Sequence, residues 1–168
     1  MTVIEEGIDG GAHRLDHLVG QESLSSWQVI DQDTVNRYAA ASGDGEDEWI
    51  HLDPERAARE APYGGTIVPG FLQIANLTRL YREAVAGFVG IDPNHTLNYG
   101  FDRLRFVAPL PVGAPFRARI RISDVRAHPA GGDIVKQDVV LEKEDGTATL
   151  VGEWLFFVSG KAFQPSAG

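Results

Sequence analysis

A run of carboxylates precedes a histidine in the first third of the chain. Asp44, Glu46, Asp47 and Glu48 lie within the seven residues before His51, and glycine is interspersed among them. A carboxylate beside an imidazole is the minimum pair that can take a proton from water and return it. The segment predicts acid–base chemistry on water. From the residues alone, an exposed acidic loop with a structurally satisfied histidine is the alternative.

A helix that could complete such a site is expected about twenty residues later. It runs from about Phe71 to Ala86 and is entered through Pro69 and Gly70. Apolar residues cover most of its circumference, which is typical of a buried helix. Its first N–H groups, near Gly70, have no partner within the helix and can face a developing oxyanion. A glycine there lets a ligand carbonyl approach closely.

Two shorter helices are expected before the buried one. The first spans residues 33–41 and is capped by Asp33 or Thr34. The second opens with Asp53 as N-cap, followed by proline and glutamate, and runs to about residue 61.

The chain after residue 93 has the alternating pattern of strands. A phase slip at Asp102–Arg103 predicts a bulge in the first of them, and a Glu144-Asp145-Gly146 turn predicts a hairpin between the last two. The strands are expected at residues 97–106, 116–123, 133–143 and 147–158. Short helices, one buried helix and an antiparallel meander predict an α+β domain with the sheet wrapped on that helix.

The stretch from Tyr38 to Leu72 resembles the hydratase motif of the MaoC-like dehydratases, especially their NodN-like branch. The likeness covers roughly residues 15–158. The matching words are Ser42-Gly43-Asp44, Trp49-Ile50-His51-Leu52-Asp53-Pro54-Glu55-Arg56-Ala57, Tyr63-Gly64-Gly65-Thr66-Ile67, Pro69-Gly70-Phe71-Leu72, Leu97-Asn98-Tyr99-Gly100 and Arg105-Phe106-Val107-Ala108-Pro109-Leu110-Pro111-Val112-Gly113.

The resemblance implies a single hot-dog domain at residues 13–158, flanked by flexible tails at 1–12 and 159–168. In this fold an antiparallel sheet curls around one long central helix. It also implies a homodimer in which two sheets join into one.

The family chemistry is the addition or removal of water across C2–C3 of an enoyl or (R)-3-hydroxyacyl thioester, carried by coenzyme A or a carrier protein, in fatty acid or polyketide metabolism. The resemblance implies that Asp44 and His51 share the water and that the Gly70 backbone holds the thioester oxygen. In the family the aspartate precedes the histidine by five residues, whereas Asp44 precedes His51 by seven. Its position in the Ser42-Gly43-Asp44 motif makes Asp44 the catalytic acid. The family spacing of five residues before the histidine instead points to Glu46, which stays the alternative carboxylate.

Five residues are candidates for binding the substrate. They are Trp49, Pro69, Phe71, Asn98 and Tyr99. For Trp49 the alternative role is to pack the loop against the body of the protein. For Tyr99 the alternative is simple burial, because an alternating strand would bury this side chain whether or not it binds substrate. Pro69 departs from many relatives, which place a histidine before the helix-opening glycine.

Composition excludes several classes of chemistry. The 168 residues include no cysteine, so disulfides, thiolate metal sites and cysteine nucleophiles are excluded. The net charge of −9 argues against a nucleic-acid partner. The four other histidines lack metal-ligand spacing, so we expect no metal, and water chemistry needs no cofactor. No run of apolar residues is long enough for a signal peptide or membrane span, so a cytoplasmic location is expected.

Two other functions stay open. A biosynthetic tailoring enzyme could dehydrate an intermediate or cyclise it by conjugate addition of a hydroxyl, and the longer Asp44–His51 spacing leaves room for this. A non-catalytic hot-dog binding subunit would result if the extra loop residues held both carboxylates away from His51.

Overall fold

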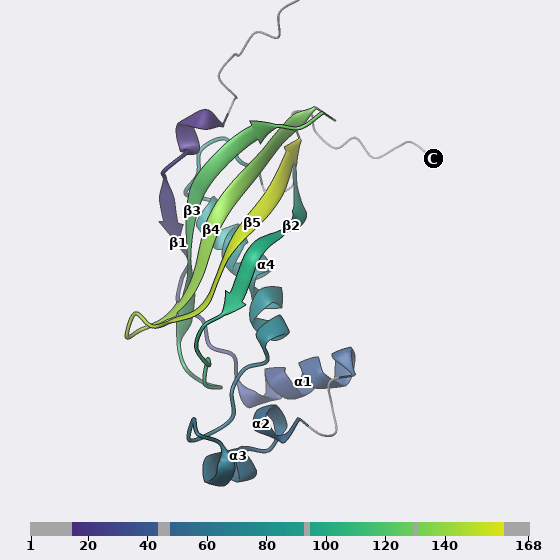
Figure 1. The fold of residues 1–168 in the computed structure, drawn as a ribbon, viewed down its shortest axis with the longest axis vertical. Helices are drawn as coiled ribbons and strands as arrows, with labels where there is room; N and C mark the ends of the chain where they lie inside the picture. Colours follow the sequence, from purple (N-terminus) through teal and green to yellow (C-terminus); the bar gives the residue numbers. More distant parts are fainter. Residues whose placement is uncertain (1–14, 44–47, 93–94, 130, 160–168) are drawn as a thin grey trace, which may run out of the picture.

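The structure of the protein, a computed structural model, describes residues 15–43, 48–92, 95–129 and 131–159 (Figure 1). Its elements are η1 (Asp16–Leu18), β1 (Glu22–Leu24), α1 (Gln32–Ser42), α2 (Trp49–Leu52), α3 (Pro54–Glu60), α4 (Gly70–Val85), β2 (Thr96–Phe106), β3 (Phe116–Ala127), β4 (Gly132–Lys143) and β5 (Ala148–Ser159). The expected tails lie outside the described residues, apart from Ser159, which pairs with Gly132 and therefore belongs to β5 rather than to a tail.

The five strands form one antiparallel sheet in the order β1-β3-β4-β5-β2 (Figure 1). The four longer strands were predicted, and β1, with only three residues, was not. The predicted 144–146 turn joins β4 to β5, and Gly146 supplies its positive φ of 81°. The expected simple meander was wrong, because β2 pairs with β5 rather than with β3. Alternation shows which face of a strand is buried but not which strand lies beside it.

The irregularity predicted in β2 is present. Its register against β5 shifts between Asp102 and Arg105, and Arg103 takes a positive φ of 52°. A second shift occurs between Asn98 and Gly100. These bulges bend β2 at the edge of the sheet.

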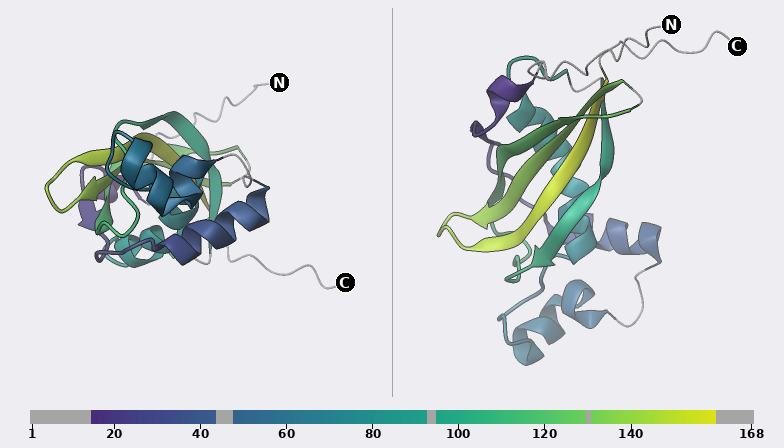
Figure 2. Two further views of the ribbon diagram at one scale, coloured as in Figure 1. Left: turned by 90° about the horizontal axis from the view of Figure 1, so that it is seen from below. Right: turned by 45° about the horizontal axis from the view of Figure 1, so that its top comes forward.

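Helix α4 lies in the hollow of the curved sheet (Figure 2). The face of α4 toward the sheet buries Leu77, Leu80 and Tyr81 against strand residues such as Phe116 and Ile120. The apolar composition of α4 predicted a helix buried on all sides. This prediction was wrong, because Phe71, the second residue of the helix, is 72% exposed. Part of its apolar surface therefore faces outward in this chain.

Helices α1, α2 and α3 gather at the end of the sheet where α4 begins (Figure 1). The side chain of Asp31, not Asp33 or Thr34, caps α1 by accepting the backbone N–H of Thr34. Asp53 caps α3 as predicted, accepting the N–H of Arg56. These caps fix where the helices around the candidate site start.

Candidate active site

His51 lies on the short helix α2, which the sequence pattern did not predict. Its Nδ1 lies 2.7 Å from the backbone carbonyl oxygen of Ile67. Because a carbonyl oxygen only accepts hydrogen bonds, Nδ1 carries the hydrogen of this contact. In the neutral ring Nε2 then keeps its lone pair and can accept a proton or a hydrogen bond from water.

The carboxamide of Gln32 joins the segments on either side of this contact. Its Nε2 donates to the backbone oxygen of His51 (2.7 Å) and to Oδ1 of Asn36 (3.0 Å). Its Oε1 accepts from the hydroxyl of Thr66 (2.8 Å). Gln32 therefore ties α1, α2 and the segment before α4 together.

A groove opens beside the imidazole, at the start of α4. Its volume is about 370 Å³, and it is lined by His51, Tyr63, Ile67, Val68, Gly70, Gln73, Phe106, Val107, Ala108 and Pro109. The wall is largely apolar with a few polar groups, as in sites for small molecules. The structure therefore brings together two of the predicted residues, His51 and Gly70.

The first turn of α4 supplies the expected backbone donors. The Gln73 N–H donates to the carbonyl of Pro69 (3.1 Å) and begins the helical hydrogen bonds, so the N–H groups of Gly70, Phe71 and Leu72 precede them. The space above Gly70 is filled by the ring of Phe106, whose Cζ would lie 2.7 Å from a Cβ there. A larger residue at position 70 would force the Phe106 ring to move, so Gly70 accommodates this packing, whereas the sequence had suggested close approach of a ligand.

The two candidate carboxylates, Asp44 and Glu46, lie outside the described residues. The chain leaves α1 through Gly43, whose positive φ of 75° closes the helix, and is described again from Glu48, at the start of α2. The segment that carries them is thus joined directly to the helix that carries His51.

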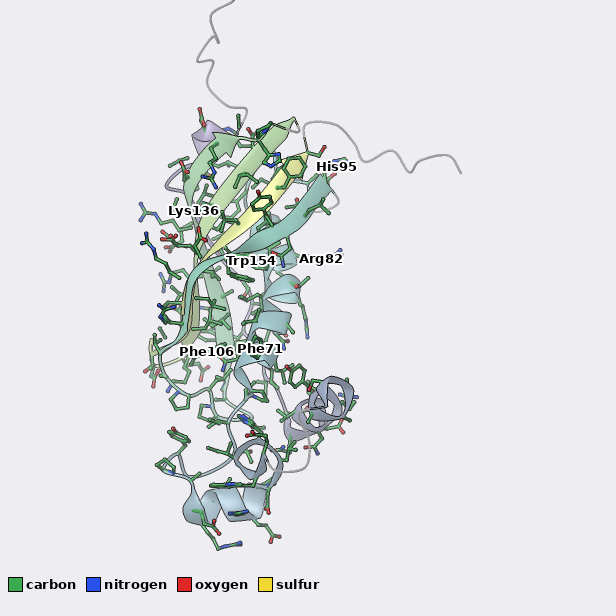
Figure 3. All side chains as sticks on the ribbon, turned by 45° about the vertical axis from the view of Figure 1, so that its right-hand side comes forward. Phe71, Arg82, His95, Phe106, Lys136 and Trp154 are labelled. Carbon is green, nitrogen blue, oxygen red and sulfur yellow. The ribbon has the colours of Figure 1, made fainter. Side chains whose placement is uncertain are left out.

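The remaining predicted binding residues do not line the groove. The ring of Trp49 lies under the guanidinium of Arg56 on α3, with the guanidinium carbon 4.5 Å from the ring centroid. The expectation that an alternating strand would bury Tyr99 was wrong, because β2 is an edge strand whose register shifts between Asn98 and Gly100; the Tyr99 side chain is exposed and meets the ring of His128 edge-on. Phe71 on α4 lies at the same level as Phe106 on β2, just above helices α1–α3 (Figure 3). Of these two residues, only Phe106 lines the groove. Pro69 is buried at the helix start, and Asn98 lines a second cavity.

This second cavity lies further along α4, toward its C-terminal end. Its volume is about 130 Å³, and its lining consists of Thr78, Tyr81, Arg82, Thr96, Asn98, Trp154 and Phe156. The indole N–H of Trp154 donates to Oδ1 of Asn98 (2.9 Å), and Tyr81 stacks on Phe156. Burial raises the pKa of Tyr81 to about 12, against a smaller opposing effect of Gln137, so its hydroxyl stays protonated at neutral pH. Arg82 is then the charged side chain of this lining.

Sequence reasoning missed both glutamines of the site. Gln73 interrupts an apolar run at the start of a buried helix, and its side chain is 3% exposed. A buried amide among apolar neighbours requires hydrogen-bond partners, so its position was a readable signal. Gln32 stands at an ordinary helix start, and only the fold shows what it contacts.

The described residues hold no group of three side chains suited to a metal ion. Within the same part of the chain, no helix is both long and apolar enough to cross a membrane.

Comparison with known proteins identifies the family. A family model described as "MaoC like domain" matches residues 16–144. The chain belongs to the MaoC-like family. Nodulation protein N of Rhizobium meliloti is 37% identical over 140 residues, which are 82% of this chain and 84% of that protein. The resemblance to the NodN-like branch is therefore confirmed.

Two further MaoC-like comparisons are informative. The 3-hydroxyacyl-thioester dehydratase Z of Mycobacterium tuberculosis is 45% identical over 100 residues, covering 60% of each protein. The (R)-hydratase from A. caviae involved in PHA biosynthesis superposes with a TM-score of 0.67 at 24% identity, covering 83% of this chain and 96% of that one. The latter confirms the hot-dog fold.

Proposed function

We propose that this MaoC-like protein is a hydro-lyase that adds water across C2–C3 of an enoyl thioester, or removes it from the 3-hydroxyacyl thioester. The MaoC-like family is one of hydratases and dehydratases, and relatives of this chain carry both names. The observation that carries the proposal is the imidazole of His51, fixed through Nδ1 at a groove that opens on the first turn of α4.

In hydration, a carboxylate of the 44–47 segment takes a proton from a water molecule held by Nε2 of His51. The water oxygen bonds to C3, and the electron pair of the double bond moves toward the thioester carbonyl. The N–H groups at the start of α4 stabilise the resulting enolate oxygen. The carboxyl group that took the proton then gives it to C2, beside the imidazole of His51, so the carboxylate and the neutral imidazole end in their starting states without a metal or redox cofactor. Asp44 is the favoured carboxylate and Glu46 the alternative.

The acyl chain is proposed to follow α4 from the groove to the second cavity. Residues four apart share one face of a helix, so Gly70, Ile74 and Thr78 form a row that connects the two. Eight residues of helix span about 12 Å. A short acyl group would end before the cavity, and a long one would reach it beside Asn98.

A homodimer is proposed to form along β2. This strand is the edge of the sheet beyond β5, and exposed edges require cover. Several large apolar side chains are exposed on or beside it, namely Phe71, Leu97, Tyr99, Phe106 and Val107. A second copy pairing its own β2 would extend the sheet and cover them. Sedimentation should show a dimer for the wild-type protein and a monomer for Leu97→Glu, and a monomeric wild type would contradict the proposal. A cytoplasmic location stays a prediction from the sequence.

The proposed reaction is tested by incubating the purified protein with crotonyl-coenzyme A and following loss of the conjugated thioester absorbance. Hydration to the (R)-3-hydroxy product is expected. No turnover of crotonyl- or longer enoyl-coenzyme A would contradict it and would favour the tailoring or non-catalytic alternatives.

A further inference from the structure

Gln73 is a buried polar residue in the wall of the groove. It lies in the first turn of α4, is 3% exposed, and lines the groove together with His51 and Gly70. Its neighbours in sequence, Leu72 and Ile74, are apolar. Burying an amide costs free energy unless its hydrogen-bonding groups find partners.

The orientation of this amide follows from its partners. Its Oε1 accepts from the hydroxyl of Thr149 on β5 (3.1 Å), which is itself fully buried. Its Nε2 is 3.4 Å from the backbone oxygen of Val68. The reverse orientation would set Oε1 against that carbonyl oxygen, and two acceptors repel. The Val68 carbonyl therefore keeps the NH₂ group on its own side, while Oε1 faces Thr149, whose hydroxyl also lies 3.4 Å from the carbonyl oxygen of Leu141.

The hydrogen-bonding capacity of this NH₂ group is only partly used. It has two hydrogens, and the one given to Val68 spans a long 3.4 Å. Across the described parts of the chain, no acceptor takes the second hydrogen. A buried, pre-oriented and half-used donor in a groove wall is a feature that a bound acceptor would explain.

We propose that Nε2 of Gln73 donates a hydrogen bond to the carbonyl oxygen of the bound acyl thioester. This inference rests on the proposed function. Val68 precedes the start of α4, so the Gln73 side chain folds back toward the end of the helix where Gly70 presents its N–H. The thioester oxygen is the acceptor that gains charge when water adds to C3. Two converging donors, one from the backbone and one from Gln73, would stabilise it.

The first test compares hydration and dehydration rates in Gln73→Met, which keeps the length of the side chain and removes its donors. We expect kcat/KM to fall about 100-fold with both crotonyl- and 3-hydroxybutyryl-coenzyme A. The matched control is Asn76→Ala on the same helix, whose amide donates to the Leu72 carbonyl (2.9 Å) and does not line the groove. It should keep the wild-type rate. Wild-type rates in Gln73→Met, or a loss confined to the hydroxyacyl substrate, would overturn the proposal.

The second test reads the hydrogen bond directly. Butyryl-coenzyme A labelled with ¹³C at the carbonyl cannot be hydrated, and its carbonyl stretch falls in frequency when donors polarise it. The wild-type protein should lower this frequency more than Gln73→Met does, and equal shifts would overturn the proposal. If Gln73→Met does not fold, Thr149→Val replaces it in both tests, because it releases Oε1 and should reduce both rate and shift. A wild type without turnover contradicts the proposed function, whereas the infrared comparison tests Gln73 separately.

Discussion

The Nδ1 atom of His51 lies 2.7 Å from the backbone carbonyl oxygen of Ile67, sixteen residues further along the chain. The contact joins α2 to the segment that leads into α4, and the N–H of Ile67 returns a hydrogen bond to the carbonyl of Ile50 (3.2 Å). The orientation of the imidazole therefore depends on the hydrogen bonds between α2 and the segment that leads into α4.

Gln32 is predicted to position His51. In Gln32→Met the hydrogen bonds to the His51 backbone and the Thr66 hydroxyl are lost, so α2 and its imidazole can shift. Because small displacements of catalytic groups are costly, kcat should fall about tenfold while KM changes little. Steady-state kinetics on crotonyl-coenzyme A check this, and the pH profile of kcat/KM should change as well.

Asn36→Ala is the control for Gln32, since it removes one partner of the same amide without touching His51. It should keep kcat and the pH profile. A Gln32→Met protein that loses thermal stability but keeps both kinetic properties would show a purely structural role.

Thr78→Phe is predicted to shorten the acyl chain that the protein accepts. The larger side chain would fill part of the second cavity, which Thr78 lines. The kcat/KM for dodecenoyl-coenzyme A should fall about tenfold, whereas that for crotonyl-coenzyme A should stay within about twofold. Ala75→Phe adds comparable bulk at an exposed position of α4 outside the cavity and should change neither value. An equal effect of Thr78→Phe on both substrates would contradict the proposed path.

Glu142 is predicted to make the fold acid-sensitive. Burial disfavours its charge, but hydrogen bonds from Arg119 and Arg117 outweigh this effect and hold the pKa of the carboxyl below its ordinary value of 4.5. The unfolded chain therefore binds a proton more readily. Stability from this group is fully present above pH 4.5 and is lost as the pH falls through the lowered pKa.

The measurement for Glu142 is the unfolding free energy as a function of pH. Glu142→Gln should flatten the loss of stability on the acid side, whereas Glu144→Gln, in the exposed hairpin turn, should leave the wild-type slope. Parallel acid profiles of wild type and Glu142→Gln would refute the prediction.

Much of the fold could be predicted because its signals are local. Asp53 before proline marks the start of α3, and Glu144-Asp145-Gly146 marks the turn between β4 and β5. The pairing of β2 with β5 depends on contacts between distant segments, and alternation does not encode it. The exposure of Phe71 likewise depends on which face of α4 the sheet covers.

The site was predictable only in part. His51 and Gly70 were singled out by local signals, carboxylates before a histidine and the start of an apolar helix, and the structure places both in the lining of one groove. The filling of the Gly70 surface by Phe106 was not predictable, since these residues come from different elements. The hydrogen bonds of Gln32 depend on three segments meeting, so no local pattern marks them.

The proposed reaction requires that His51 and a carboxylate of the 44–47 segment activate water. The most direct measurement is kcat for crotonyl-coenzyme A hydration in the wild type and in His51→Ala, Asp44→Asn and Glu46→Gln. His51→Ala and Asp44→Asn should each lose about 100-fold or more, because each removes a group that moves or holds the proton. Glu46→Gln should stay close to wild type, and a reversed order of the two carboxylates would assign the acid to Glu46. Wild-type kcat in His51→Ala would contradict the account.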